Sequence, residues 1–263
     1  MTRFFGVAAI ALLGAGIWYY ARGPVPTPVM EHGEPAPDDW LEDLYSDNPR
    51  EVEAASEEVA SLGARALPAV QRVLRDHNAE AERIKAALKA AGIIGQAAAP
   101  AIPDVAALLA EPGVTSEAAI ALSYMGREAF PPLRDALKSE DAIVRREALR
   151  SIGKLKQRAP LELEVVLPLL LAKMADPDPG VRAVRATYLG IIHEGAEEAV
   201  PALIKGLADQ DAEVRRASAA ALGSFGPEAA PALPALRKAA GDRNEDVASE
   251  AGRTMAKLQA RTP

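Results

Sequence analysis

The feature of this sequence that most constrains its fold is an internal repeat. The stretch from Asp211 to Asp242, DAEVRRASAAALGSFGPEAAPALPALRKAAGD, recurs in partial copies along residues 50–260. A proline followed two residues later by an aliphatic residue recurs at intervals of about 28 to 37 residues, at Pro68, Pro103, Pro131, Pro168, Pro201 and Pro234. A period of this length is typical of a solenoid of stacked helical pairs.

Each copy predicts two helices. In the first half, small and apolar residues fall at i, i+3, i+4, i+7, i+8 and i+11, the buried face of a helix: Val214, Ala217, Ser218, Ala221, Leu222 and Phe225. Asp211 stands where an N-cap belongs, and Gly223 with Gly226 predicts the end of that helix. A second helix follows, because Pro231 and Pro234 fall at its boundary and in its first turn, where no intrahelical donor is lost.

The front of the first helix carries the motif Asp-x-x-Val-Arg, which begins at Asp141, Asp178 and Asp211. With the Ala-rich helix, the Leu-Gly step and Gly-x-Glu-Ala-x-Pro-Ala-Leu, this pattern resembles HEAT-repeat proteins, particularly the short bacterial HEAT-like repeats of phycobilin lyases. The resemblance covers about residues 50–260. It implies an all-α, right-handed α-solenoid of about six and a half helical hairpins. The first three units lack the Asp-x-x-Val-Arg motif, and the last stops after one helix, which suits a terminal cap.

Three arginines of this motif, Arg145, Arg182 and Arg215, recur beside an aspartate. Phosphate binding is one reading of such arginines. Their regular placement instead predicts a ladder of charge-assisted hydrogen bonds from one repeat to the next.

A segment at the N-terminus has the composition of a membrane or signal helix. Residues 4–20, FFGVAAIALLGAGIWYY, are uncharged, and at ~1.5 Å per residue they span roughly 25 Å, slightly less than the ~30 Å hydrocarbon core. An uncleaved anchor, a cleaved signal peptide and a buried soluble helix all fit this composition. The poor cleavage pattern and the aromatic cluster of Trp18, Tyr19 and Tyr20 favour the anchor. The predicted organisation is therefore a signal anchor or signal peptide at 1–22, a proline-rich linker at 23–38 and the repeats at 39–263.

Charge flanking this segment predicts its orientation. Arg3 and the α-amino group precede it, whereas after Arg22 no lysine or arginine occurs until Arg50. The positive-inside rule then places the repeats outside the cytoplasm, periplasmic in a bacterium, in a single-pass membrane protein or a secreted one after signal cleavage. Just after the linker, an apolar cluster at helical spacing predicts a short helix that covers the open end of the first repeat: Trp40, Leu41, Leu44 and Tyr45.

Signs of catalysis are few. The chain has no cysteine, which excludes disulfides and thiolate metal sites, and of its three histidines, His32, His77 and His193, only the last has an adjacent acid, Glu194. Two ligands do not make a competent metal site. Nucleophile elbows, phosphate loops and dinucleotide fingerprints are missing from the sequence. We therefore expect no enzyme, no catalytic residue, no metal and no cofactor.

A candidate partner-binding surface emerges from comparison of the second helices. Positions three, four and seven residues after each repeated proline face away from the core, and basic residues at or near them form a discontinuous stripe: Arg72, Arg75, Arg134, Lys138, Lys205, Arg237 and Lys238. On a chain of net charge −7, this stripe is a candidate face for an acidic partner. Ordinary solvated side chains are the alternative. Apolar residues interrupt the stripe and would give the same groove an apolar middle: Ala106, Ala107, Leu171 and Ile204.

Two functions follow as hypotheses. The first is a non-enzymatic, membrane-tethered scaffold that binds a protein or peptide along the groove lined by the second helices. The alternative, implied by the resemblance to phycobilin lyases, is a lyase-like or chaperone-like accessory factor acting on a cofactor-bearing or unfolded protein, which requires a pocket with converging polar groups. Nucleic acid is not an expected partner, because the chain is acidic and poor in aromatic residues.

Overall fold

The computed structural model describes residues 39–159 and 161–260. The expected membrane segment at residues 4–20 and the proline-rich linker lie outside the described residues. In the described ranges all regular secondary structure is helical, as the repeat predicts.

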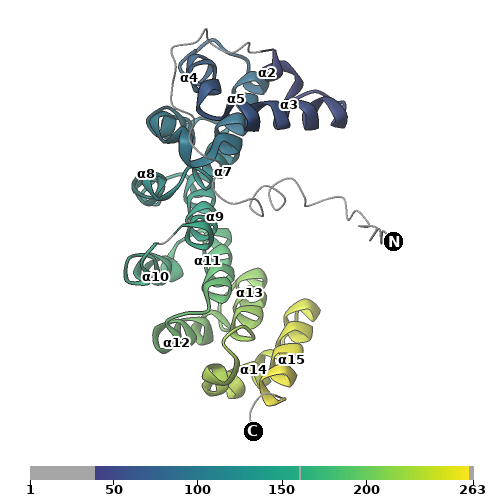
Figure 1. Ribbon diagram of the computed structural model, residues 1–263. Coiled ribbons are helices and arrows are strands. Elements are labelled where there is room, and N and C mark those ends of the chain that lie inside the picture. Colours follow the sequence, from purple (N-terminus) through teal and green to yellow (C-terminus); the bar gives the residue numbers. More distant parts are fainter. Residues whose placement is uncertain (1–38, 160, 261–263) are drawn as a thin grey trace, which may run out of the picture. The chain divides into compact units, whose positions relative to one another are not determined.

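The helices alternate between two layers, seen in Figure 1 as two neighbouring columns. The first layer holds the A helices, which are α3 (Pro49–Leu62), α5 (Ala81–Ile94), α7 (Thr115–Leu122), α9 (Ala142–Arg158), α11 (Pro179–Ile192), α13 (Ala212–Leu222) and α15 (Glu245–Gln259). The second holds the B helices, which are α4 (Leu67–Leu74), α6 (Ile102–Ala107), α8 (Phe130–Ala136), α10 (Leu163–Ala172), α12 (Ala196–Gly206) and α14 (Leu233–Ala239). Within residues 39–159 and 161–260, this order gives six hairpins followed by a single helix, as predicted.

Short 3-10 helices join many of these elements. They are η1 (Gly63–Ala66), η2 (Gly95–Ala101), η3 (Leu108–Ala110), η4 (Arg127–Ala129), η5 (Lys173–Ala175) and η6 (Gly226–Ala232). The tighter 3-10 turn lets the chain reverse between an A helix and its B helix within a few residues.

Side-chain caps fix where the A helices of the later repeats begin. Asp211 accepts hydrogen bonds from the backbone N–H groups of Glu213 and Val214, at 2.9 and 3.2 Å. Asp141, Asp178 and Asn244 cap α9, α11 and α15 in the same way. The predicted N-cap role is therefore confirmed, and each cap satisfies an N–H group that has no partner inside the helix.

All six repeated prolines lie on B helices. Four of them stand in the first turn, where the missing N–H costs nothing, and Pro168 and Pro201 lie inside α10 and α12. Pro234 occupies the predicted first turn of α14, and Pro231 falls in η6 just before it. The helix that contains Pro201 begins five residues earlier, at Ala196, because the turn that precedes it is shorter.

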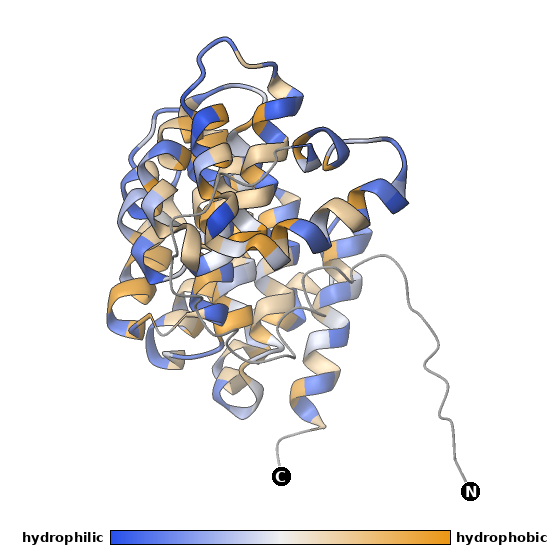
Figure 2. Ribbon diagram, turned by 45° about the horizontal axis from the view of Figure 1, so that its top comes forward, coloured by the Kyte–Doolittle hydropathy of each residue, from blue (hydrophilic) through white to orange (hydrophobic). Residues whose placement is uncertain are grey.

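The core runs between the two layers and consists of aliphatic and small residues. The aliphatic residue two positions after each repeated proline is fully buried, with 0% exposure at Val70, Val105, Leu133, Leu170, Leu203 and Leu236. On the A side, all six residues of the predicted face of α13 are buried as well. In Figure 2 hydrophobic stretches run along the helices where they pack, and hydrophilic residues mark many outer turns.

Glycines let neighbouring A helices approach closely. A Cβ at Gly190 of α11 would lie 2.6 Å from the Cα of Ala221 on α13, and a Cβ at Gly153 of α9 would lie 2.0 Å from the ring of Tyr188 on α11. Both distances are far below van der Waals contact. At Gly153 and Gly190, therefore, only glycine fits where consecutive A helices approach.

The predicted cover of the first repeat is also present. Trp40, Leu41 and Leu44, in and after α2 (Trp40–Asp43), are 1 to 3% exposed and belong to the core cluster, and α2 packs against α3 and α5. Tyr45 differs from the prediction, because its side chain is 41% exposed at the end of the cluster.

One helical run among the described residues, Ala81–Ala110, is long and apolar enough to cross a membrane by length and composition. It comprises α5, η2, α6 and η3, and many of its apolar residues belong to the core cluster of the repeats. A core helix passes the same length and composition test, so the match is weak as a sign of membrane insertion.

Candidate partner-binding site

The arginines of the repeated motif join consecutive repeats. Arg182 on α11 donates to both carboxylate oxygens of Asp209, at 2.8 and 2.7 Å, and its remaining nitrogen donates to two backbone carbonyls of the preceding turn. Arg145 donates in the same bidentate way to both carboxylate oxygens of Asp176, and Arg215 does so to those of Asp242. The predicted repeat-to-repeat ladder is therefore confirmed. Its acceptor is the aspartate two residues before the next N-cap, and not the N-cap itself.

The ladder is built into the protein and largely closed to ligands. The side chains of Arg145 and Arg215 are 9% and 8% exposed. The hydrogen bond to Asp242 raises the pKa of Arg215, and the same contact, with the backbone N–H of Asn244, lowers the pKa of Asp242. Bidentate pairs of this kind fix geometry as well as charge, which assigns these residues to the framework between repeats.

One arginine next to the ladder has no partner. Arg185, one turn after Arg182 on α11, is 0% exposed, and none of its three nitrogens has a hydrogen-bond partner. Burial lowers the pKa of Arg185 to about 9, although the negative charge of Asp176 acts to raise it. The equivalent position holds Ala148 on α9 and Ser218 on α13, so α11 carries a long cation where its neighbours carry a small side chain.

The histidines occupy surface turns. His193 caps the end of α11 in the left-handed region, with φ 41°, and is exposed. His77 is exposed in the turn after α4, and His32 lies outside the described residues. Residues 39–159 and 161–260 contain no group of three or more His, Asp or Glu side chains placed to hold a metal ion.

All seven predicted basic residues are exposed, and all lie on B helices or within two residues of their C-terminal ends: Arg72, Arg75, Arg134, Lys138, Lys205, Arg237 and Lys238. Acidic residues lie within ion-pair distance of Arg75, Arg134 and Lys138. Arg75 donates to Asp104 at 2.9 Å, and Asp135 lies 2.7 Å from Lys138 and 3.7 Å from Arg134. Positive charge on α4 and α8 is therefore partly neutralised by these carboxylates.

The other end of the stripe is different. Within the described residues, Lys205 on α12 and Arg237 and Lys238 on α14 make no ion pair. α12 packs against η6, which leads directly into α14, so these three cations lie on adjoining elements.

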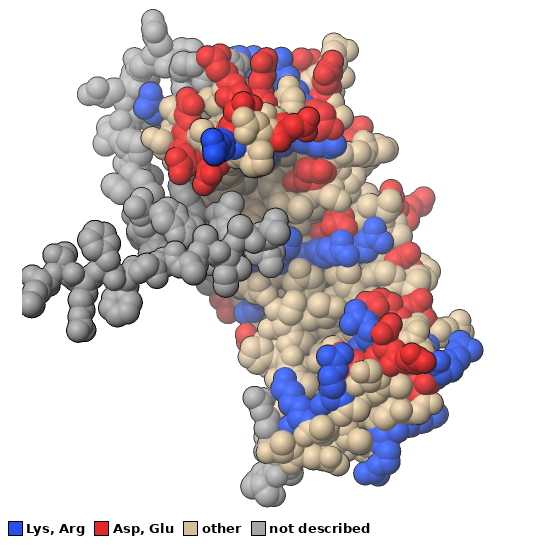
Figure 3. Space-filling view, turned by 90° about the vertical axis from the view of Figure 1, so that its right-hand side faces the viewer, with Lys and Arg blue, Asp and Glu red and all other residues tan. Residues whose placement is uncertain are grey.

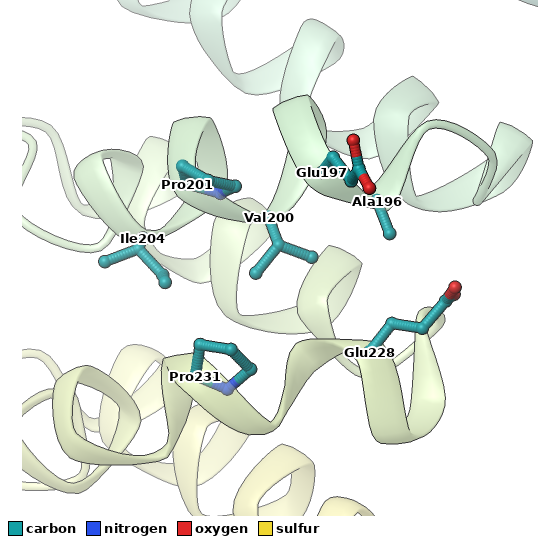
Figure 4. Close-up of a pocket in the computed structure, with 7 residues that line it drawn as sticks. All are labelled: Ala196, Glu197, Val200, Pro201, Ile204, Glu228 and Pro231. Carbon is teal, nitrogen blue, oxygen red and sulfur yellow. The ribbon is translucent and has the colours of Figure 1, made fainter.

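A groove opens beside these cations. It lies between α12 and η6 and has a volume of about 260 Å³, and its lining is Ala196, Glu197, Val200, Pro201, Ile204, Glu228 and Pro231. Figure 4 shows Val200, Ile204 and Pro231 facing the space between the two elements. The predicted apolar middle is thus present at Ile204, whereas Ala106, Ala107 and Leu171 do not line this groove.

The groove carries opposite charges toward its two ends. Glu197 and Glu228 lie together at the end where α12 and η6 begin (Figure 4), and both are exposed without an ion pair in the described part of the chain. Lys205 lies eight residues further along α12, about 12 Å away at 1.5 Å per residue. An apolar floor with carboxylates at one end and cations toward the other favours a ligand of defined direction.

A second hollow, of about 390 Å³, lies over the ladder and is lined by Met174, Ala175, Asp176, Arg182, Ala208, Asp209 and Gln210. The charged side chains of its lining already form ion pairs within the protein. Arg182 and Asp209 pair with each other, and Asp176 pairs with Arg145. The groove between α12 and η6 is therefore the better candidate for a binding site.

Sequence reasoning missed the two glutamates of this groove. Glu197 and Glu228 precede the repeated proline region, whereas the comparison of B helices considered only positions after the proline. A signal was present, because Glu-Ala-x-Pro recurs as Glu198-Ala199-Val200-Pro201 and Glu228-Ala229-Ala230-Pro231. Alignment of the acid three residues before Pro201 and Pro231 would have found Glu228 but not Glu197.

Comparison with known proteins supports the fold. A family profile described as HEAT repeats matches residues 102–172 and 166–256, together more than half of the chain. The search of curated protein sequences with this chain found no match.

Solved structures with a similar fold include karyopherins. Kap121p bound to Pho4p matches with a TM-score of 0.63 and 16% identity, over 84% of this chain and 29% of Kap121p. A Kap95p structure with RanGDP matches with a TM-score of 0.56 and 16% identity, over 85% of this chain and 34% of the other. The chain thus spans about a third or less of these larger solenoids, and the likeness concerns the fold alone. With the profile match, the stacked hairpins and the arginine ladder, the chain belongs to the HEAT-repeat family.

Proposed function

We propose that this chain is a protein-binding scaffold without chemistry of its own, which holds a peptide segment of its partner in the groove between α12 and η6. The observation that carries the proposal is the groove itself. It combines an apolar floor, two unpaired glutamates at one end and unpaired cations toward the other.

The lining defines the chemistry of the segment. Val200, Ile204 and Pro231 offer apolar surface to an aliphatic side chain, which gains about 25 cal/mol for each Å² removed from water. Glu197 and Glu228 suit a lysine or arginine next to it. An acidic continuation of the segment would then run toward Lys205, Arg237 and Lys238, and this end retains the expectation of an acidic partner.

The size of the groove favours a peptide over a cofactor. Its volume of about 260 Å³ holds one or two side chains, whereas pockets for drug-sized ligands span about 300–1,000 Å³. The lyase-like or chaperone-like alternative needs polar groups that converge on a bound cofactor. Here the two charged side chains of the lining, Glu197 and Glu228, lie at one end, and the middle is apolar.

The fold supports such a role. Structures of Kap121p include complexes with Pho4p and with the extreme C-terminus of the protein phosphatase Cdc14p, so a related solenoid accommodates segments of other proteins. The surfaces used there are not inferred for this chain, because the identity is 16%.

We further propose that the scaffold is tethered to a membrane by residues 4–20 and faces the periplasm. This rests on the apolar composition of that segment, on Arg3 before it and on the scarcity of lysine and arginine after it. Membrane fractionation with intact-mass analysis tests the tether. A mass near 27.7 kDa in the membrane fraction is expected, and a shortened soluble product would show signal cleavage instead.

Selection from a displayed peptide library on the full-length protein in detergent tests the groove. We expect enriched peptides with an aliphatic residue beside lysine or arginine. The double variant Glu197→Lys/Glu228→Lys should weaken binding by more than about tenfold, because it places cations where the peptide needs carboxylates. The matched control is Glu57→Lys/Glu58→Lys, an equal charge change at exposed residues of α3, which should leave binding unchanged. Equal losses in the two variants would refute the site.

A further inference from the structure

A second charged surface lies on the A layer, on helix α9. Its outward face carries four cations at a spacing of four residues, Arg146, Arg150, Lys154 and Arg158, called here the α9 row. Residues four apart share one face of a helix and rise ~6 Å per step, so the row is about 18 Å long. None of these residues belongs to the basic stripe on the B helices.

Neighbouring A helices frame the row with aromatic and aliphatic side chains. The guanidinium of Arg158 lies 4.2 Å from the centre of the ring of Tyr124, in the turn after α7, and donates to its hydroxyl at 3.3 Å. On the other side, the ring of Tyr188 from α11 packs over Gly153. Ile120 of α7 and Ile191 of α11 are 41% and 40% exposed.

Positive charge in the row is only partly balanced. Glu147 is the carboxylate within ion-pair distance, at 2.7 Å from Arg150 and 3.6 Å from Arg146. Lys154 makes no ion pair among the described residues, and burial together with the charges of Arg158 and Arg150 lowers its pKa, opposed by Glu147. The Nε of Arg146 is buried without a hydrogen-bond partner. Like charges four residues apart destabilise a helix, and a bound anion would relieve this repulsion.

We propose that the α9 row binds an extended acidic peptide of a partner protein, with carboxylates at alternating positions. Side chains on one edge of an extended strand repeat every two residues, ~6.6 Å apart, which nearly matches the ~6 Å steps of the row. Ile120 and Ile191 would receive apolar side chains that flank the carboxylates. The site is independent of the groove on the B helices and would let the scaffold hold a second segment.

The charge distribution favours a peptide over a nucleic acid. In Figure 3 a band of Lys and Arg crosses the middle of this face near the height of α9, while acidic side chains crowd its upper part. With a net charge of −7, the chain repels a long polyanion that extends beyond the row. A short segment with few carboxylates avoids that repulsion.

Fluorescence anisotropy on the full-length protein tests this proposal. The probe is a labelled capped peptide in which glutamate and serine alternate, compared with a peptide of the same composition with the glutamates in one block. We expect the alternating peptide to bind more tightly. The variant Arg150→Glu/Lys154→Glu should weaken its binding by more than about tenfold, because it reverses the centre of the row. The control, Arg253→Glu/Lys257→Glu on α15, changes the net charge equally at two exposed cations that are also four residues apart, and should retain binding within about twofold.

Three results would overturn the proposal. Equal loss of binding in both variants would show general charge attraction, and equal affinity for the two peptides would remove the argument from spacing. Tighter binding of a single-stranded oligonucleotide of equal charge would assign the row to nucleic acid. Loss of the helical circular-dichroism signal in the α9 variant would call for the milder change Arg150→Gln/Lys154→Gln, which must then show the weaker binding.

Discussion

Asp209 shows at the scale of a residue how the ladder contributes to stability. It accepts two hydrogen bonds from Arg182 and one from the backbone N–H of Asp211. Asp209→Asn keeps the shape but removes the charge, so Arg182 remains half-buried without its counter-ion. We expect the free energy of unfolding to fall by about 3 kcal/mol, the lower end for breaking a buried ion pair, in urea titrations at pH 7.

The same variant has a defined pH dependence. Burial raises the pKa of Asp209, but the hydrogen bonds from Arg182 and Asp211 outweigh it, and the net shift is downward from 3.8. A carboxyl with a lowered folded pKa adds stability above its unfolded pKa of ~3.9, and this stability is lost as the pH falls through the folded value. The difference between wild type and Asp209→Asn should therefore be constant from about pH 5 to 7 and shrink below about pH 4. If the difference in the free energy of unfolding were as large at pH 3 as at pH 7, this account of Asp209 would be wrong.

Arg185 predicts the opposite effect on stability. It is a buried cation without a hydrogen bond, so Arg185→Met should remove a desolvation cost and raise the free energy of unfolding by about 1 to 4 kcal/mol at pH 7. The folded pKa of about 9 lies below the unfolded value, so the gain should be complete at pH 7 and decrease above pH 9. Thermal unfolding at pH 7 and pH 10 measures both. The matched control on α11, Arg182→Met, should destabilise because it breaks the ladder.

At the scale of the element, packing of consecutive A helices depends on glycine at the crossing. Gly190→Ala would place its Cβ 2.6 Å from the backbone of Ala221 and force α11 and α13 apart. We expect a loss of about 1 to 3 kcal/mol, as in overpacked cores, measured by chemical unfolding. Gly252→Ala on α15 is the control. Its Cβ would meet no atom within 4 Å, and the gain in helix propensity should stabilise the protein by about 0.5 to 1 kcal/mol. If Gly190→Ala and Gly252→Ala lowered the free energy of unfolding equally, the close approach of α11 and α13 would not explain the glycine at position 190.

The helices were largely predictable because local chemistry sets them. Asp211 caps α13 by its own side chain, and the spacing of Val214 and Leu222 follows the period of a helix, so neither depends on distant residues. The prolines marked every B helix for the same reason. Their exact starts were less predictable, as Pro201 shows, because the start depends on the preceding turn.

Contacts between elements were harder to predict. The ladder was expected from Arg145, Arg182 and Arg215, but its acceptors follow from how one repeat stacks on the next. The basic stripe was read as one surface, yet Asp104 and Asp135 pair with three of its cations, Arg75, Arg134 and Lys138. The glutamates of the groove lie at the same end of it only because α12 and η6 lie side by side.

At the scale of the molecule, the described repeats present two surfaces of different chemistry. The B layer offers an apolar groove with acidic and basic ends, and the A layer offers the α9 row. Each repeat contacts only its neighbours, so a change in α12 should leave the first repeats untouched. The ladder joins the last repeats to one another, which is the fixed spacing that the proposed scaffold would need to hold a segment.

The most direct measurement is hydrogen–deuterium exchange of the full-length protein with and without a peptide selected on it. Binding in the groove should slow exchange in α12 and from η6 into α14, and leave α3 and α5 unchanged. The Glu197→Lys/Glu228→Lys variant should lose this protection at the same peptide concentration. Protection confined to the A helices, or the same protection in that variant, would contradict a peptide-binding groove between α12 and η6.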